Sequence, residues 1–141
     1  MDIRLLPFNK LIGLEIAGSE GDLMVCLPAG SQYLNHLGTV HGSALLAVAE
    51  AGSGEYLFRN LGHISNVFPV VRKLEAKFRK PANGKVTAKC TVIRAVVDGW
   101  VSELETRGRV LANVPVDVVD STNAVVLSAV VEWFITRSKN A

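Results

Sequence analysis

Three of the polar residues in the segment from Asn35 to Gly52 are candidates for chemistry by their type and spacing. They are an amide, Asn35, a histidine, His41, and a carboxylate, Glu50, which follows His41 by nine positions. The residues between His41 and Glu50 are almost uniformly small and apolar. A carboxylate in such surroundings is costly to bury unless it is hydrogen-bonded or protonated, which is one property of a catalytic acid or base. The alternative is that Glu50 reaches the surface or pairs with an arginine, and the helix pattern alone leaves both open.

The segment that carries Glu50 is expected to form one helix of about twenty residues, which begins near residue 41 or 42 and ends near residue 61. Thr39 is a candidate N-cap, and Gly62 falls at the C′ position. The helix is apolar or small nearly all round, including the side opposite Glu50, which holds Leu45, Val48, Ala49, Gly52 and Tyr56. This pattern is typical of a buried helix, so we expect a sheet to wrap it.

Two glycines, Gly52 and Gly54, lie inside this predicted helix. Each costs roughly 1 kcal/mol of helix propensity relative to alanine. The loss makes sense if this part of the helix approaches a strand, another helix or a ligand closely.

The rest of the chain is predicted to form six strands. They are expected at residues 12–18, 23–29, 72–78, 85–97, 109–120 and 124–137. In the third, Leu74, Ala76 and Phe78 alternate with charged residues, as in a half-buried antiparallel strand. A proline, Pro115, indicates an edge position or a bulge in the fifth.

A second, shorter helix is predicted at residues 99–107, between the fourth and fifth strands. Asp98 would cap it, Trp100 and Leu104 would share one face, and Gly108 would end it. The fold class is therefore α+β, as one domain over residues 1–141 with the order strand, strand, helix, strand, strand, helix, strand, strand.

The motif Asn35-x-x-Gly38-x-x-His41-Gly42, followed eight residues later by Glu50, resembles the signature of hotdog-fold acyl-CoA thioesterases. It is most similar to the phenylacetate-pathway and 4-hydroxybenzoyl-CoA types. The order of the elements and the sequence at residues 77–86 are also similar, so the resemblance covers most of the chain. It implies the hotdog fold, in which an antiparallel sheet wraps one long central helix.

The resemblance also implies a role for each residue of the motif. The backbone N–H of Gly42, at the helix N-terminus, would polarise a thioester carbonyl and stabilise its developing negative charge. Glu50 would be the nucleophile or the general base that activates water. Asn35 would orient that water or the carbonyl, and His41 would shape the loop and the start of the helix.

The length of the helix adds a geometric condition to these roles. Eight helical residues separate Gly42 from Glu50 by about 12 Å along the axis. An attacked carbonyl must lie within about 3 Å of both its oxyanion donor and its nucleophile or activated water. One helix cannot supply both, so we predict a homodimer, with a dimer of dimers as a further option, in which Asn35 and Gly42 of one subunit act with Glu50 of another.

The chain departs from the family pattern at two points. Ser43 replaces the second glycine of the motif and, with Gly38, is predicted to line the bound substrate. Related thioesterases often place a hydroxyl near the carboxylate, but the corresponding positions here, Gly54 and about Val71, have none. Ser53 is the candidate substitute, although a serine on such a helix is more often simply packed.

Basic side chains at Arg72 and Lys73, and also at Arg79 and Lys80, are candidates for binding the phosphates of coenzyme A. Solvated strand faces carry the same residues, so this pattern is weak. Coenzyme A would be part of the acyl-CoA substrate, and no separate cofactor is predicted. An acyl carrier protein in its place stays open, as does the identity of the acyl group.

Two other functions fit the same fold. A hotdog enoyl-thioester hydratase also uses a histidine and a helix acid, but its acid generally follows the helix-start glycine by about five residues rather than eight. An acyl-CoA-binding protein without turnover would keep the pocket and lack the nearby hydroxyl. The motif spacing favours the thioesterase.

Composition excludes several other classes. The net charge of +2 and the lack of a basic run with aromatic residues argue against a nucleic-acid partner. The apolar runs are too short for the roughly 20 residues of a membrane span, and residues 1–10 do not fit a secretory signal, so we expect a cytoplasmic protein without a membrane partner. Cys26 and Cys90 lack further ligands at suitable spacing, so we expect buried thiols and no metal site.

Overall fold

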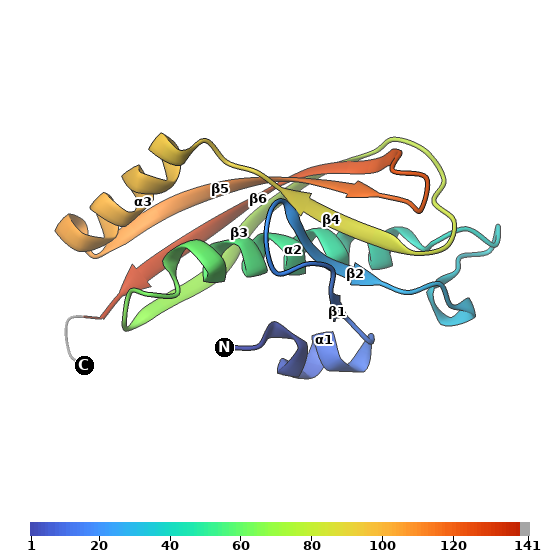
Figure 1. Ribbon diagram of the computed structural model, residues 1–141, viewed down its shortest axis with the longest axis horizontal. Coiled ribbons are helices and arrows are strands. Elements are labelled where there is room, and N and C mark those ends of the chain that lie inside the picture. The colour runs from blue at the N-terminus through green and yellow to red at the C-terminus, as the bar shows by residue number, and fades with distance from the viewer. Residues whose placement is uncertain (139–141) are drawn as a thin grey trace.

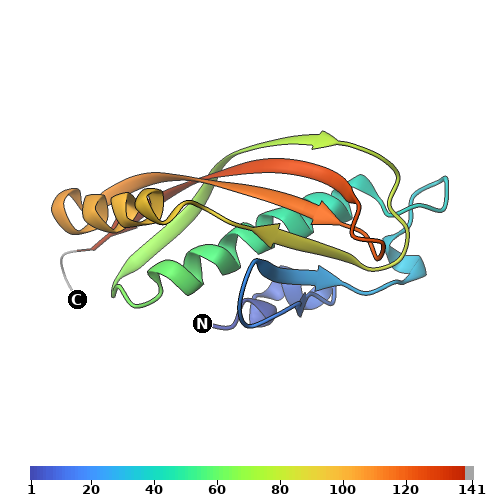
Figure 2. The same ribbon diagram turned by 45° about the horizontal axis from the view of Figure 1, so that its top comes forward.

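The structure, a computed structural model, describes residues 1–138. Its six strands form one antiparallel sheet with the strand order β1-β2-β4-β5-β6-β3. The strands are β1 (Glu15–Ile16), β2 (Leu23–Leu27), β3 (Val67–Phe78), β4 (Val86–Cys90), β5 (Arg109–Val119) and β6 (Val125–Arg137). The helices are α1 (Pro7–Leu11), α2 (Gly42–Leu61) and α3 (Arg94–Arg107), with short 3₁₀ helices at Ile3–Leu5 and Ser31–Tyr33. The sheet curves around α2 (Figures 1 and 2), which confirms the predicted class and the order of the main elements.

Helix α2 packs mainly on β2, β4 and β5, and it lies closest to β4 at Gly52. A Cβ atom at Gly52 would lie 2.5 Å from the Cβ of Ala88, a distance that real side chains do not reach. The predicted close approach is therefore confirmed at this glycine. At Gly54 a Cβ would lie 3.5 Å from the Trp133 ring, which is ordinary contact, so glycine is not sterically required there.

The ends of α2 differ in detail from the prediction. The N-cap is His41, whose ring nitrogen accepts a hydrogen bond from the helix, and not Thr39, which bonds to Asn35 instead. Gly62 follows the last helical residue, but its φ of −64° is right-handed, so it is an ordinary C-cap rather than a left-handed C′ glycine.

The prediction for residues 85–97 is wrong in its second half. The strand β4 ends at Cys90, and α3 begins at Arg94 rather than Gly99. The apolar, β-branched run at 92–97 favours a strand locally, but Val97 extends the buried helical stripe of Trp100 and Leu104 by one turn. Asp98 consequently lies inside α3, where it forms an exposed ion pair of 3.1 Å with Arg94, and does not cap the helix.

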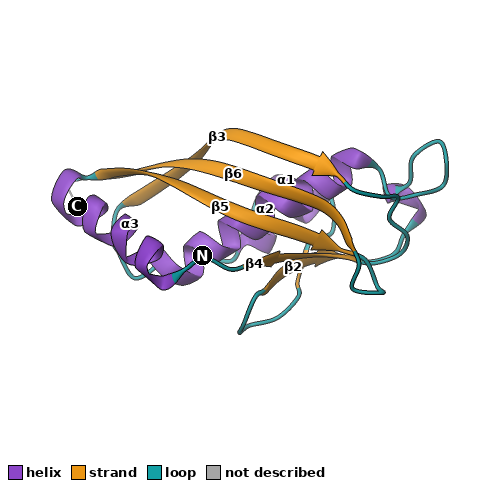
Figure 3. Ribbon diagram, turned by 90° about the horizontal axis from the view of Figure 1, so that it is seen from above, coloured by secondary structure: helices purple, strands orange, loops and turns teal. Residues whose placement is uncertain are grey.

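Strand β5 borders β4 along only part of its length. The register pairs Val116–Val119 with β4, so Pro115 comes directly before the first paired residue, at a local edge of the sheet. The helix α3 packs beside the part of β5 that β4 does not reach (Figure 3). The edge position predicted from Pro115 is confirmed, and Gly108, with φ of 74°, ends α3 as expected.

Strand β3 lies at the edge of the sheet and is exposed along nearly its whole length. Its register places Leu74 opposite Val131 and Phe78 opposite Leu127, so these residues face inward as predicted. Leu74 is only partly buried and Phe78 is 54% exposed, because α2 packs mainly under the other strands. The prediction of a half-buried strand is therefore wrong for the isolated subunit.

The two cysteines are buried and unpaired, as predicted, and burial raises the pKa of the Cys90 thiol to about 12. No helix among residues 1–138 has the length and apolar character needed to cross a membrane.

Candidate functional site

The loop that leads into α2 is held together by the side chain of Asn35. Its Oδ1 accepts hydrogen bonds from the backbone N–H groups of Leu37 at 2.9 Å and Thr39 at 3.1 Å. Gly38 adopts a φ of 76°, which favours glycine, and it closes the turn by donating its N–H to the Asn35 carbonyl. Within the subunit, the first task of Asn35 is thus to shape the loop that precedes His41.

His41 joins this loop to the helix. Its backbone N–H donates to the carbonyl of Tyr33 at 2.7 Å, and its Nδ1 accepts from the N–H of Ser43 at 2.9 Å. A neutral ring that accepts at Nδ1 carries its proton on Nε2. These contacts support the predicted structural role of His41 at the start of the helix.

Gly42 has the one free backbone donor among the first three residues of α2. The N–H groups of Ser43 and Ala44 are satisfied by the side chain and the carbonyl of His41, whereas within residues 1–138 the Gly42 N–H has no acceptor. A Cβ atom at Gly42 would lie 3.2 Å from the ring of Phe78. The missing side chain therefore lets the partly exposed Phe78 ring pack closely against Gly42.

Glu50 lies two turns further along α2, with its side chain half-buried. No hydrogen bond or ion pair to its carboxylate occurs within the described part of the chain, and burial raises its pKa. The arginine partner that would have made Glu50 structural is therefore absent from residues 1–138. The result is an unpartnered, partly desolvated carboxylate, a state that is compatible with a catalytic base or nucleophile.

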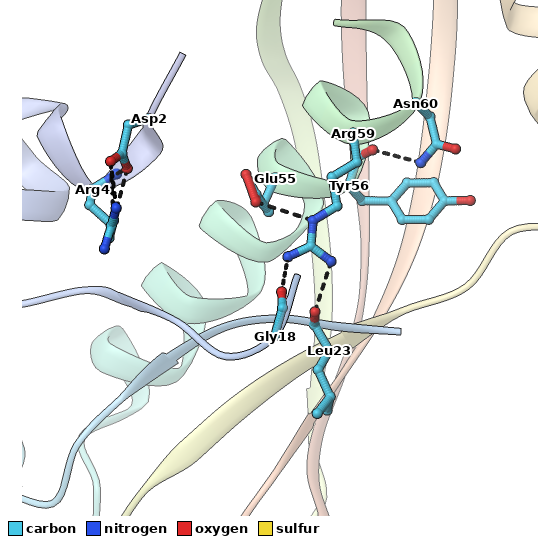
Figure 4. Close-up of polar contacts among 8 residues, drawn as sticks. All are labelled: Asp2, Arg4, Gly18, Leu23, Glu55, Tyr56, Arg59 and Asn60. Atoms are coloured by element: carbon cyan, nitrogen blue, oxygen red, sulfur yellow. Dashed lines mark hydrogen bonds and ion pairs between the residues drawn. The ribbon is translucent and has the colours of Figure 1, made fainter. Parts of the chain in front are cut away.

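The structural acid on α2 is Glu55, which the sequence analysis missed. Glu55 forms an ion pair of 3.2 Å with Arg59, and Arg59 also donates to the backbone carbonyls of Leu23, at 2.9 Å, and Gly18 (Figure 4). Through these hydrogen bonds and the ion pair, α2 is connected to the β1–β2 hairpin. The Glu-to-Arg spacing of four residues is the sequence signal that could have revealed it.

Ser53 lies in the core, not in an accessible site. Its side chain is 0% exposed, and its Oγ donates to the Glu50 carbonyl at 2.7 Å and accepts from the Trp133 indole at 2.8 Å. Because the hydroxyl is enclosed and both of these interactions are made inside the subunit, the substrate-binding role predicted for Ser53 does not fit its position.

Two of the predicted phosphate-binding residues, Arg72 and Lys73, lie on the exposed strand β3, and the other two, Arg79 and Lys80, directly follow its last residue, Phe78. Arg72 lies where the β3–β6 register shifts, and Lys73 pairs at 2.9 Å with Glu75, whose hydrogen bond raises the pKa of Lys73. Further along, Arg79 donates to Ser128 at 3.1 Å. These cations do not converge on one point within the subunit.

The candidate residues thus form two groups in one subunit. The first comprises the loop and helix start, with Asn35, Gly38, His41, Gly42 and Ser43. The second is Glu50, about 12 Å further along the helix. A cavity of about 440 Å³ lies beside the first group, where Gly38 and Val40 help to line it, and does not include Glu50. Within residues 1–138, no three His, Cys, Asp or Glu side chains are grouped as metal ligands.

Several solved structures share this architecture. A Pseudomonas aeruginosa protein of unknown function, described as a probable thioesterase, is 20% identical, with a TM-score of 0.83 over 96% of this chain and 91% of that one. A Haemophilus influenzae thioesterase is 17% identical, with a TM-score of 0.73 over 99% and 90%. A Staphylococcus aureus thioesterase, solved as a mutant, is 17% identical, with a TM-score of 0.72 over 93% and 99%.

These likenesses confirm that the chain has the hotdog fold. No curated protein matches its sequence. Residues 3–135 match a family defined by sequence, described as a domain of unknown function. The chain belongs to this family, DUF4442.

Proposed function

We propose that the protein is a thioesterase that hydrolyses the thioester bond of an acyl-CoA. The observation that carries this proposal is the presence of two groups without a partner on the same helix. They are the free N–H of Gly42 and the carboxylate of Glu50. A donor at a helix N-terminus suits a developing oxyanion, and a partly desolvated carboxylate suits a base or nucleophile.

The reaction uses these groups in a simple sequence. The Gly42 N–H donates to the thioester carbonyl oxygen, which makes the carbon more electrophilic. In the general-base form, Glu50 takes a proton from water as the water attacks, and the collapsing intermediate releases the thiol of coenzyme A and the free acid. In the nucleophilic form, Glu50 attacks the thioester carbon, and the C–S bond breaks so that coenzyme A leaves as a thiolate and an anhydride forms. Water then hydrolyses the anhydride, which regenerates Glu50 and releases the free acid.

The geometry of α2 supports a site that is shared by two subunits. About 12 Å of helix separates the donor from the carboxylate, whereas both must lie about 3 Å from the reacting group or its activated water. We therefore propose a homodimer in which Gly42 of one subunit acts with Glu50 of the other, with association of two such dimers as a further option.

The exposed strand β3 supports this dimer. It leaves one row of backbone groups unpaired at the sheet edge, and it exposes Phe68 by 57% and Val70 by 57% on its outer face. On its inner face the exposed Phe78 lies beside Gly42. Pairing of two β3 strands would satisfy these unpaired backbone groups and remove the exposed β3 edge from each subunit.

A similarity in spacing also supports the proposal. Two solved structures of the Staphylococcus aureus protein are variants in which a glutamine and a glutamate, 15 positions apart, are each replaced by alanine. In the present chain Asn35 and Glu50 are also 15 positions apart. This favours the proposal that the amide and the carboxylate belong to one working motif, with Asn35 acting on the carbonyl or water of a neighbouring site.

The exposed Arg72 and Lys73 are proposed to bind coenzyme A phosphates once two subunits meet at β3.

A second candidate function is acyl-CoA binding without turnover. The observation that favours it is the lack of an accessible hydroxyl near Glu50, because Ser53 is buried and the residue one turn further is Gly54.

Release of free thiol from a panel of aromatic, short-chain and medium-chain acyl-CoAs tests the proposal. Wild type should release thiol, Glu50→Gln should not, and Glu105→Gln, the same change on the exposed face of α3, should behave as wild type. Binding of acyl-CoA without thiol release would favour the binding protein. Hydration of an enoyl-CoA would favour a hydratase.

A further inference from the structure

The Glu50 carboxylate has no hydrogen-bond or ion-pair partner within residues 1–138, so its position depends on the backbone of α2. A displacement of the helix by even 1 Å would move the carboxylate away from a bound thioester. The contacts that hold the turn after Glu50 therefore also determine where its carboxylate lies.

Two buried side chains form a directed chain of hydrogen bonds to this turn. The Trp133 indole Nε1–H on β6 donates to the Ser53 Oγ at 2.8 Å, and the Ser53 hydroxyl donates to the backbone carbonyl of Glu50 at 2.7 Å. Ser53 is 0% exposed and Trp133 is 8% exposed, so water does not compete strongly with either bond. This series of hydrogen bonds ends at Glu50, the residue that carries the proposed catalytic carboxylate.

A second contact holds the same turn from another strand. At Gly52 the helix approaches Ala88 of β4 so closely that a Cβ atom would be only 2.5 Å from the alanine methyl group. The helix is thus pressed onto β4 at Gly52 and hydrogen-bonded to β6 through Ser53. Together these contacts leave the turn from Glu50 to Gly54 little freedom to move.

We infer that Ser53 and Trp133 are positioning residues for Glu50, which they fix in place through its backbone carbonyl. This inference rests on the proposed function for its catalytic consequence. Ser53 thus has a role other than the predicted substrate contact: its hydroxyl acts on the carbonyl of Glu50 and not on the acyl-CoA.

Replacement of Trp133 with phenylalanine tests the inference, because it keeps most of the aromatic packing and removes the indole donor. The matched control is Trp100→Phe: Trp100 is 5% exposed in α3, and its indole donates no hydrogen bond within the described residues. Measured on folded protein well below its melting temperature, Trp133→Phe should lower kcat for thiol release roughly tenfold and leave KM nearly unchanged. Trp100→Phe should change neither.

A second variant serves if Trp133→Phe does not fold. Ser53→Ala removes one oxygen atom and with it both hydrogen bonds between Trp133 and the Glu50 carbonyl, so it should lower kcat to a similar extent. The double variant Ser53→Ala/Trp133→Phe should be no slower than the slower single variant, because either change already disconnects β6 from the Glu50 carbonyl.

An NMR titration separates this inference from the proposed function. The Glu50 side-chain carboxyl ¹³C signal, assigned by its absence in Glu50→Gln, reports the environment of the carboxylate whether or not the protein turns over a thioester. In Trp133→Phe and Ser53→Ala its pKa should move toward the ordinary glutamate value, while Trp100→Phe should leave it as in wild type. Failure of wild type to release thiol would refute the proposed function alone, whereas an unchanged Glu50 titration or kcat in both site variants would overturn the positioning role.

Discussion

Glu50 and Glu55 lie five residues apart on α2. Of these two acids, only Glu55 has an ion-pair partner within residues 1–138. The Arg59 guanidinium neutralises Glu55 and also binds two backbone carbonyls of the β1–β2 hairpin. Glu50 is half-buried with no such partner, and burial raises its pKa. The two acids are therefore expected to respond in opposite ways to substitution.

Replacement of Glu50 with glutamine should abolish most of the activity and yet stabilise the subunit. Because burial raises the pKa of Glu50, the folded state holds this proton more tightly than the unfolded chain. The stability linked to the proton is complete at low pH and is lost as the pH rises through the folded-state pKa. At about pH 8, Glu50→Gln should therefore unfold at a higher urea concentration than wild type. Equal or lower stability, with Glu105→Gln as the neutral control, would count against a desolvated carboxylate.

Replacement of Glu55 with alanine should instead destabilise the fold. The Glu55 side chain is 9% exposed and that of Arg59 is 19% exposed, so removal of the acid leaves a largely buried cation. We expect a loss of about 3 kcal/mol in the free energy of unfolding. Urea denaturation measures this loss, and a change below about 0.5 kcal/mol would show that the network does not hold the helix to the hairpin.

The raised pKa of Glu50 also predicts the pH dependence of catalysis. Both proposed mechanisms need the ionised carboxylate, so kcat/KM should rise with pH up to the pKa of Glu50 and level off above it. The midpoint should lie above that of an ordinary exposed glutamate. A pH–rate profile of thiol release measures it, and a rate that does not vary between about pH 4 and pH 8 would contradict this assignment.

The two glycines inside α2 should respond differently to alanine. Gly52→Ala places a methyl group 2.5 Å from the Ala88 Cβ, so the helix must move, and we expect a loss of about 1–3 kcal/mol. Gly54→Ala meets only ordinary contact with the Trp133 ring at 3.5 Å and should stabilise the helix by about 0.5–1 kcal/mol. Thermal unfolding of the two variants compares them directly; equal effects would show that the approach to β4 is not tight.

Gly42 offers a test of the proposed oxyanion donor that leaves the rest of the helix start intact. Gly42→Pro removes the N–H and adds a ring at the first helical position, where proline is favoured, and His41 already has the extended φ of −61° and ψ of 139° that a following proline requires. Gly42→Ala adds a similar Cβ beside Phe78 but keeps the N–H. We expect Gly42→Pro to lower kcat by about 10²- to 10³-fold relative to Gly42→Ala. Equal activities would remove the Gly42 N–H from the mechanism.

The fold was largely predictable because its strongest signals are local. The apolar run from Gly42 to Leu61 set the central helix, and period-two alternation set the later strands. The start of α3 was missed because the β-branched run at 92–97 resembles a strand, whereas its burial depends on packing beside β5. The exposure of β3 was missed because it also depends on packing in three dimensions. Only the position of α2 shows that the inner face of β3 is largely uncovered.

The candidate site was predictable in part. The motif located the loop, the helix start and Glu50, but a single sequence could not show whether Glu50 has a partner or which way Ser53 points. Those features depend on residues far away in the chain, such as Trp133, which bonds to Ser53 across 80 positions. The Glu55–Arg59 pair, by contrast, lies within four positions and could have been found from the sequence.

Mixing two inactive variants tests the central claim of a site shared between subunits. In a heterodimer of one Gly42→Pro subunit and one Glu50→Gln subunit, one shared site carries both changes and the other carries neither. If each variant alone is inactive, unfolding and refolding them together at equal concentrations should restore about a quarter of the wild-type activity, since half of the dimers are mixed and each has one intact site. If the mixture stays as inactive as its components while mixed dimers are shown to form, Gly42 and Glu50 do not act across the subunit interface.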